Sequence, residues 1–268
     1  LWSTLVGCWK LFLIFKKHKF DIIQYSTPKA ALISSLAGFM TGIPKRLYCQ
    51  WGIRYVAFSG YKRRLFRLLE KFTCLLSTDI APDSYGNLEF AIDEGLYPRT
   101  KGSVVHNGSA NGVNLEKFNI NHKQAWRKNT RSGLGLDENS FVYGFVGRIT
   151  KDKGINELVY AFLEISISDS NTFLLLVGPE EDNSGLNKLV LDTIQNHPQV
   201  IMAGRKNNPE EYIAAMDVVV LPSYREGFGI VAIEAQAMGV PVITTDIPGP
   251  REALINGETG ILVPVANK

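Results

Sequence analysis

The sequence predicts an α/β protein made of two doubly wound, Rossmann-like domains. Short apolar runs alternate with helical segments along the chain, and Gly or Pro stands at most of the junctions between them. Continuous apolar runs are typical of parallel strands that helices cover on both faces. The chain has 268 residues, which is enough for two domains of about 130 residues each.

The second half of the chain carries the clearer pattern. From residue 141 onward, apolar runs of strand length are separated by segments with helical periodicity. The expected strands are 141–147, 172–177, 200–202, 218–221, 240–244 and 260–263, and the expected helices are 155–165, 185–196, 209–216, 230–238 and one that begins at Pro250.

The first half repeats this alternation more weakly. The expected strands are 21–25, 46–49, 79–81 and 103–105, and a cationic helix is expected over 61–76. The apolar segment 1–15 is shorter than the roughly 20 residues of a membrane span, and Lys10 interrupts it. We therefore expect an amphipathic core helix there, with a helix lying in a membrane interface as the alternative.

Polarity suggests where the domains divide. We expect an amino-terminal domain over 1–118, a polar and basic linker over 119–139, and a carboxyl-terminal domain over 140–268. The chain starts at Leu1 and stops soon after the last expected strand, so we expect a fragment in which both domains are truncated at the chain ends. The cleft between two such domains is the expected ligand site.

Composition excludes several classes of protein. With 45% hydrophobic residues the chain can fill a packed core, which excludes disordered and fibrous classes. The three cysteines, Cys8, Cys49 and Cys74, lie far apart, which argues against a disulfide scaffold and fits a reducing, cytoplasmic compartment. The four histidines never stand at ligand spacing from cysteine or carboxylate, so we expect no metal site.

Charge is divided unevenly along the chain. Residues 1–135 hold 20 Lys and Arg against 8 Asp and Glu, a net charge of +12, whereas residues 136–268 hold 9 against 18, a net charge of −9. A basic half suits nucleic acid, an anionic lipid surface or a phosphorylated substrate, and the alternative is a merely solvated basic surface. Aromatic and basic residues do not interleave as in nucleic-acid-binding modules, so we expect no nucleic-acid partner.

The most informative motif lies between an expected strand and an expected helix. It runs from Ser223 through Glu226, Gly227, Phe228 and Gly229 into the helix that contains Glu234. The start of a helix offers unpaired N–H groups to an anion, and glycine lets the backbone approach a ligand closely. A carboxylate on each side suits the hydroxyls of a sugar and of a ribose that flank a diphosphate. The alternative is a helix cap with two solvated glutamates.

A second motif follows the strand 141–147. The turn from Gly147 to Gly154 contains Arg148, whose planar guanidinium suits two phosphate oxygens, and Lys153, which adds a point charge. The alternative is a tight turn with surface basic residues. Both motifs end strands of one expected parallel sheet, so they lie at the same edge of that sheet.

Together these motifs resemble the retaining glycosyltransferases of family 4, whose fold is the two-domain GT-B architecture. The turn 147–154, the block 221–243 and the closing stretch 257–263 carry the resemblance. It is strong after Phe141 and looser before it. Segments 51–55, 59–63 and 107–118 are similar to members that build bacterial capsules and other surface polysaccharides.

The resemblance implies that domain 1–118 lies on the acceptor side and that domain 140–268 binds the donor. It also implies a role for each motif residue. Arg148 and Lys153, beside Gly147, would bind the donor diphosphate. Glu226, as the catalytic residue, would hold the hydroxyls of the transferred sugar next to the backbone of Gly227, Phe228 and Gly229. Glu234 would bind the ribose, and Arg205 would lie near the base. The family needs no divalent metal or other cofactor, and the co-substrate is expected to be a UDP-sugar. The acidic stretch 180–182 is expected to be a solvated loop.

The sequence therefore predicts a glycosyltransferase of bacterial surface polysaccharide biosynthesis that acts with retention on a glycan or polyprenyl-phosphate-linked acceptor. A cytoplasmic location, with peripheral contact to the inner face of an anionic membrane through the basic half, follows from the charge distribution. Trp51 stands where many members have a histidine. Two alternatives stay open: a sugar-nucleotide epimerase of the same fold, and a non-catalytic remnant that binds nucleotide sugars.

Overall fold

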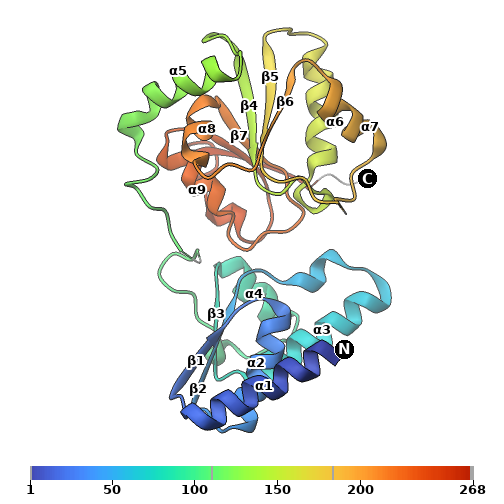
Figure 1. Cartoon of the computed structure of the whole chain (residues 1–268), viewed down its shortest axis with the longest axis vertical. Helices are drawn as coiled ribbons and strands as arrows, with labels where there is room; N and C mark the ends of the chain where they lie inside the picture. Colours follow the sequence, from blue (N-terminus) through green and yellow to red (C-terminus); the bar gives the residue numbers. More distant parts are fainter. Residues whose placement is uncertain (1, 110, 183, 266–268) are drawn as a thin grey trace. The chain divides into compact units, whose positions relative to one another are not determined.

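The chain forms two compact units, which we describe separately. The computed structural model describes residues 2–109, 111–182 and 184–265, except for the side chains of residues 2–4 and 57. The first unit comprises Leu1–Ala110 and the second Asn111–Lys268. Figure 1 shows the elements of both units in chain order.

The first unit is a small parallel sheet with helices. Its strands β1 (Ile22–Tyr25), β2 (Lys45–Gln50) and β3 (Asp79–Pro82) pair in the order β1-β2-β3. Helix α2 contacts both α1 and α3 (Figure 1). Tyr25, Tyr48 and Ile80 of the strands are buried together with Cys74 of α3. The helical elements are α1 (Trp2–His18), α2 (Pro28–Met40), the 3₁₀ helix η1 (Arg54–Ala57), α3 (Gly60–Leu76), α4 (Tyr85–Asp93) and the 3₁₀ helix η2 (Arg99–Lys101).

Three of the four strands expected in this unit are confirmed within two residues. The fourth, at 103–105, is wrong. There the chain makes a single bridge between Gly102 and Ile80 and then turns at His106, whose φ is 49°. One pairing followed by a turn is too short for a strand. The cationic helix expected over 61–76 is confirmed as α3.

Helix α1 forms where a core helix was expected, and its face with Cys8, Leu11, Phe12 and Phe15 packs into a small core cluster, but the helix is not amphipathic, because its other face is apolar as well. Phe15 is buried, whereas Leu5 and Trp9 are 63% and 60% exposed and Leu13 and Ile14 are exposed as well. The apolar residues of this helix point to more than one side, so packing against α2 covers only part of them. Within the described part of the chain, no helix has the length and apolar character that crossing a membrane requires.

The second unit is built on a parallel sheet with the strand order β6-β5-β4-β7-β8-β9. Its core includes Phe145 of β4, Leu175 of β5 and Val219 of β7, together with Phe162 of α6. The strands are β4 (Phe141–Val146), β5 (Thr172–Val177), β6 (Val200–Gly204), β7 (Val218–Leu221), β8 (Val242–Thr245) and β9 (Gly260–Val263). The helices are α5 (Lys123–Gly133), α6 (Ile155–Ser166), α7 (Lys188–Asn196), α8 (Pro209–Ala215) and α9 (Ile230–Ala237), and the 3₁₀ helices are η3 (Ile120–His122), η4 (Lys151–Lys153) and η5 (Pro250–Glu252).

The expected strands of this half are confirmed within two residues, and so are its helices apart from two. Helix α7 begins three residues later than expected. At Pro250 the chain forms only the 3₁₀ helix η5 instead of a helix. Gln236 of α9 donates a hydrogen bond to the carbonyl of Ala253 at 2.6 Å. The Ala253 carbonyl thus accepts a hydrogen bond from a side chain, where in a longer helix it would accept one from a backbone N–H of the next turn.

The expected linker, residues 119–139, is instead part of the second unit. Its helix α5 packs on α8, and Arg131 of α5 is 1% exposed. Arg131 donates to Asp217 at 2.7 Å and Arg127 donates to the same carboxylate at 2.5 Å. Two of the basic residues that suggested a solvated linker, Arg127 and Arg131, thus form ion pairs within the second unit. The two compact units divide between residues 110 and 111.

Replacing Asp217 tests how firmly α5 is attached. Asp217→Asn leaves the buried Arg131 without a charged partner, so we expect the free energy of unfolding of the second unit to fall by about 2 kcal/mol. Urea denaturation followed by circular dichroism measures this. Asp246→Asn, which breaks an exposed pair with Arg251, is the control and should cost under about 0.5 kcal/mol. Equal effects of the two variants would contradict the buried role of Asp217.

Candidate functional site

The two sequence motifs meet at the carboxyl ends of two neighbouring strands. Strands β4 and β7 pair in parallel, so the turn after β4 and the loop after β7 leave the sheet at the same edge. The backbone N–H of Tyr224 donates to the carbonyl of Asp152 at 3.0 Å and ties the two segments together.

Gly154 makes this close approach possible. Its φ is 73°, and a Cβ built on it would lie 2.0 Å from the carbonyl oxygen of Pro222. Both the left-handed backbone and the contact exclude a side chain at this position. The turn that carries Arg148 and Lys153 can therefore lie directly against the loop that carries Glu226.

The central contact of the site is an ion pair between Lys153 and Glu226. Lys153 Nζ lies 2.5 Å from Glu226 Oε1, and the two side chains are only 18% and 17% exposed. The hydroxyl of Ser223, whose residue is fully buried, donates to the same carboxylate oxygen at 2.8 Å. Two donors on one oxygen fix the orientation of the Glu226 carboxylate.

Arg148 lies in a chain of charges beside this pair. Its guanidinium contacts Glu181 at 3.2 Å and Asp152 at 3.3 Å. Arg225, the neighbour of Glu226, reaches the same Asp152 oxygen at 3.3 Å. Asp152 thus links Arg148 to the loop after β7, while Glu181 holds Arg148 from the segment after β5.

The protonation of these groups follows from their neighbours. Desolvation lowers the pKa of Arg148, but its hydrogen bond to Glu181 and the charge of Asp152 outweigh this effect, so the pKa is raised. Desolvation raises the pKa of Asp152, but a hydrogen bond from Thr150 and the charges of Arg148 and Arg225 lower it below its usual range. Arg148 and Asp152 are therefore both held in their charged forms.

The start of helix α9 completes this part of the site. Gly229 caps the helix with a φ of 83°, and Phe228 is buried in the core, so the segment of Gly227, Phe228 and Gly229 is anchored beside Glu226. Gly227 is itself held close to the next loop, because a Cβ on Gly249 would lie 2.0 Å from its carbonyl oxygen. Helix α9 therefore begins at Ile230, four residues after Glu226.

Two predicted residues lie apart from the Lys153–Glu226 pair. Glu234 lies in α9 and its pKa is raised. Burial is the main cause, the charge of Lys117 lowers the pKa, and the charge of Glu210 raises it. Lys117 and Glu210 contact each other at 3.5 Å, so Glu234 lies near a separate charge cluster. Arg205 follows β6, is exposed and forms no ion pair with a described residue.

Three charged residues of the site are absent from the sequence prediction. Asp152, Glu181 and Arg225 all belong to the network around Arg148. The stretch 180–182 was expected to be a solvated loop, but Glu181 is paired with Arg148. Asp152 and Arg225 lie inside the two sequence motifs themselves, and this is the signal that sequence could have offered. Within the described part of the chain, no three His, Cys, Asp or Glu residues cluster as a metal site would require.

Comparison with known proteins relates this chain to a family. The profile of the family described as "Glycosyl transferases group 1" matches residues 127–268. The capsular polysaccharide biosynthesis glycosyltransferase CapM of Staphylococcus aureus is 37% identical over 98% of this chain and 68% of its own length. An Escherichia coli protein named UDP-Gal:alpha-D-GlcNAc-diphosphoundecaprenol alpha-1,3-galactosyltransferase is 29% identical over 94% of this chain and 65% of its own length. The chain thus spans about two thirds of these relatives.

Solved structures share the fold. HepE of Anabaena, crystallised in complex with UDP, superimposes with a TM-score of 0.77 at 22% identity, over 96% of this chain and 68% of that one. A glycosyltransferase from Rickettsia africae gives a TM-score of 0.75 at 22% identity, over 99% of this chain and 68% of that one. The predicted α/β fold of the GT-B type is confirmed.

Substituting Gly154 tests the close approach on which the site depends. Gly154→Ala forces Cβ against the Pro222 carbonyl as well as straining the backbone, so we expect the free energy of unfolding to fall by at least about 2 kcal/mol. Gly135→Ala is the control, because Gly135 has a φ of 71° but nothing within 4 Å of its Cβ position; it should cost about 1 kcal/mol. Chemical denaturation measures both, and equal losses would show that the approach to Pro222 is not constraining.

Proposed function

Because the chain belongs to the group 1 glycosyl transferases, the retaining glycosyltransferases of family 4, we propose that it uses a UDP-sugar to glycosylate a glycan or lipid-linked acceptor with retention, in bacterial surface polysaccharide biosynthesis. The single observation that carries this proposal is the contact between Lys153 and Glu226 at the start of α9, with Arg148 in the adjoining charge network. It brings cations, a helix start and an oriented carboxylate to one edge of the sheet.

Each of these groups has a part in the proposed reaction. As the sugar leaves the diphosphate, negative charge grows on the phosphate oxygens. Arg148, Lys153 and the N–H groups at the start of α9 stabilise this charge more in the transition state than in the ground state. Glu226 accepts hydrogen bonds from hydroxyls of the transferred sugar and orients it. In this proposal Glu234 binds the ribose and Arg205 lies near the base.

Relatives support the choice of substrates. The name of CapM refers to capsular polysaccharide, and the name of the Escherichia coli relative specifies a UDP-galactose donor and a diphosphoundecaprenol-linked acceptor. HepE was crystallised with UDP-glucose as well as with UDP. We therefore propose a UDP-linked donor and a polyprenyl-diphosphate-linked glycan as the acceptor, with the chain in the cytoplasm.

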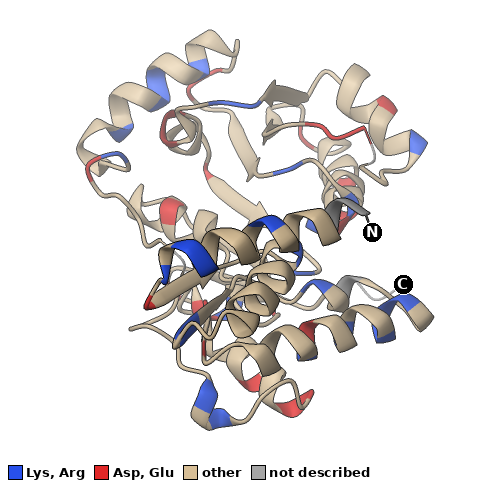
Figure 2. Cartoon of the chain, turned by 60° about the horizontal axis from the view of Figure 1, so that its bottom comes forward, with Lys and Arg blue, Asp and Glu red and all other residues tan. Residues whose placement is uncertain are grey.

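A cationic helix motivates peripheral contact with an anionic membrane. Along the outer side of α3, apolar residues recur at helical spacing and are between 39% and 78% exposed: Tyr61, Leu65, Leu68, Phe72 and Leu75. The same helix carries five cations, and its one acidic residue, Glu70, is buried. Figure 2 shows blue segments and no red ones along α1, whose start is marked N. An exposed apolar stripe beside cations is typical of helices that lie in an anionic interface.

Substituting Arg148 tests the donor site. Arg148→Ala removes charge-assisted hydrogen bonds to the diphosphate, so we expect UDP to bind at least about tenfold more weakly. Glu181→Gln removes a carboxylate that competes for Arg148, so UDP should bind more tightly. Isothermal titration calorimetry with UDP measures both variants. Wild-type affinity in Arg148→Ala would end the assignment of Arg148 to the diphosphate.

Incubation with UDP-sugars alone tests the reaction class. A transferase should leave the donor almost unchanged without an acceptor, because the attacking hydroxyl is absent. Chromatography of the nucleotide products measures this. An epimer of the sugar, or rapid release of UDP with free sugar, would favour the epimerase alternative. A chain that binds UDP but transfers no sugar to any polyprenyl-linked glycan, even when it is extended to the full length of its relatives, would favour a non-catalytic binding protein.

Vesicle flotation tests the membrane contact. Leu68→Glu combined with Phe72→Glu places two negative charges in the exposed stripe, so we expect binding to phosphatidylglycerol vesicles to fall at least about fivefold. Ile167→Glu, at a residue of the second unit that is 86% exposed, is the control and should leave binding unchanged. Equal binding to phosphatidylglycerol and phosphatidylcholine vesicles at low and high salt would contradict the proposal.

A further inference from the structure

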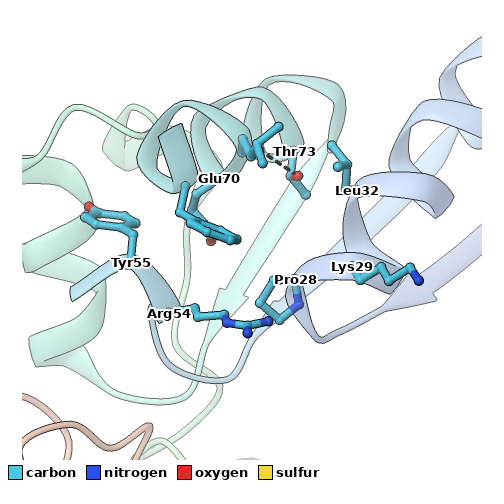
Figure 3. A pocket seen from close by; sticks show the side chains of 9 residues that line it. Pro28, Lys29, Leu32, Arg54, Tyr55, Glu70 and Thr73 are labelled. Atoms are coloured by element: carbon cyan, nitrogen blue, oxygen red, sulfur yellow. Dashed lines mark hydrogen bonds between the residues drawn. The ribbon is translucent and has the colours of Figure 1, made fainter. Parts of the chain in front are cut away.

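The first unit contains a pocket that the donor chemistry does not use. It has a volume of about 360 Å³ and lies between η1, α2 and α3 (Figure 3). Helix α2 begins three residues after the end of β1, and η1 begins four residues after the end of β2, so the pocket lies near the carboxyl ends of parallel strands, where α/β sheets bind ligands. Its lining residues are Pro28, Lys29, Leu32, Arg54, Tyr55, Phe66, Leu69, Glu70 and Thr73.

The walls of the pocket are mostly apolar. Leu32 of α2 and Phe66 and Leu69 of α3 are partly buried and face the pocket together with Pro28. Leu69 follows Leu68 of the exposed stripe by one residue, so the same helix presents apolar side chains both to the pocket and to the outside. A cavity of this size and lining suits an apolar group.

One buried carboxyl group is built into the wall. Glu70 is 6% exposed, and its Oε1 accepts hydrogen bonds from Tyr48 at 2.9 Å and from Gln50 at 2.6 Å. Tyr97 in turn donates to Gln50 at 2.9 Å. This network holds Glu70 in one orientation beside the cavity. Burial raises the pKa of Glu70, and the hydrogen bonds from Gln50 and Tyr48 lower it, with burial prevailing. Its environment therefore favours the neutral form more than water does.

Two cations belong to the same pocket. Lys29 in the first turn of α2 and Arg54 of η1 are both exposed and form no ion pair with a described residue. The guanidinium of Arg54 lies 5.6 Å from the ring centre of Phe66 and 6.0 Å from that of Phe58. Figure 3 shows Arg54 next to Pro28, where η1 approaches the start of α2. Charge thus stands at the exposed side of a mainly apolar cavity.

We propose that this pocket binds the phosphate-bearing end of an isoprenoid lipid. The first isoprene units lie against Leu32, Phe66 and Leu69, and the phosphate is held by Arg54. Lys29, whose side chain extends away from Arg54 in Figure 3, has a rotatable stem that lets its ammonium turn toward the same phosphate. Other ligands use only one feature of the pocket. A free phosphate gains nothing from the apolar walls, and a neutral sugar leaves both cations unused. The choice of an isoprenoid, as the carrier of the acceptor, rests on the proposed function.

Binding of geranyl phosphate to the 268-residue chain tests the inference. The wild-type chain should bind geranyl phosphate at least tenfold more tightly than either geraniol or inorganic phosphate. Arg54→Glu should weaken geranyl phosphate binding at least tenfold, and Leu69→Trp, which fills the cavity, should abolish it. Arg64→Glu makes the same charge change at an exposed residue of α3 outside the pocket lining, so it should leave the affinity within twofold.

UDP titrated into the same samples separates this inference from the donor proposal, because the pocket and the Lys153–Glu226 pair lie in different units. UDP binding without geranyl phosphate binding would overturn the pocket assignment and leave the donor site intact. Geranyl phosphate binding without UDP binding would support the pocket and refute the donor site. Equal weakening by Arg54→Glu and Arg64→Glu, or equal affinity for geranyl phosphate and inorganic phosphate, would also overturn the pocket assignment.

Discussion

The approach of the turn after β4 to the loop after β7 is the constraint on which the proposed donor site depends. Gly154 permits it, since its Cβ position would lie 2.0 Å from the Pro222 carbonyl. Only with the two segments this close can Lys153 reach Glu226 across 73 residues of sequence. The pairing of β4 with β7 sets the register of the approach. The hydroxyl of the buried Ser223 then orients the Glu226 carboxylate that Lys153 contacts. Packing of the sheet therefore determines the chemistry at its edge.

Most of the second unit could be predicted from sequence because its strands are continuous apolar runs. Val218–Leu221, for example, is buried at every position, and such a run has few alternatives in a chain of this type. Prediction failed where a long-range contact decides the local structure. The segment 119–139 resembles a solvated linker until Asp217, far along the chain, accepts from Arg127 and Arg131. Composition alone does not reveal such a partner.

The site shows the same limit. Arg148, Lys153 and Glu226 were identified because phosphate and sugar recognition need those residue types at strand ends. Asp152 and Glu181 were not identified, because binding a donor does not require a carboxylate beside a cation. Their contacts with Arg148 are visible only in the structure, which places the segments after β4 and β5. Their presence has a physical consequence. A diphosphate that binds Arg148 must exchange existing ion pairs for new ones, so the net gain is smaller than for an unpaired arginine.

Helix α3 explains part of the excess of basic residues in the first half of the chain. Helix α3 carries five cations and its one acidic residue is buried, so its exposed surface attracts anions. Arg63 and Arg67 are paired with Glu94, which leaves Lys62, Arg64 and Lys71 beside the exposed apolar stripe. Internal pairing thus accounts for only part of the basic excess. The remaining cations belong to a helix whose apolar side chains are exposed on one side and line the pocket on the other side. An anionic lipid would contact the cations with its charged group and the apolar side chains with its hydrocarbon.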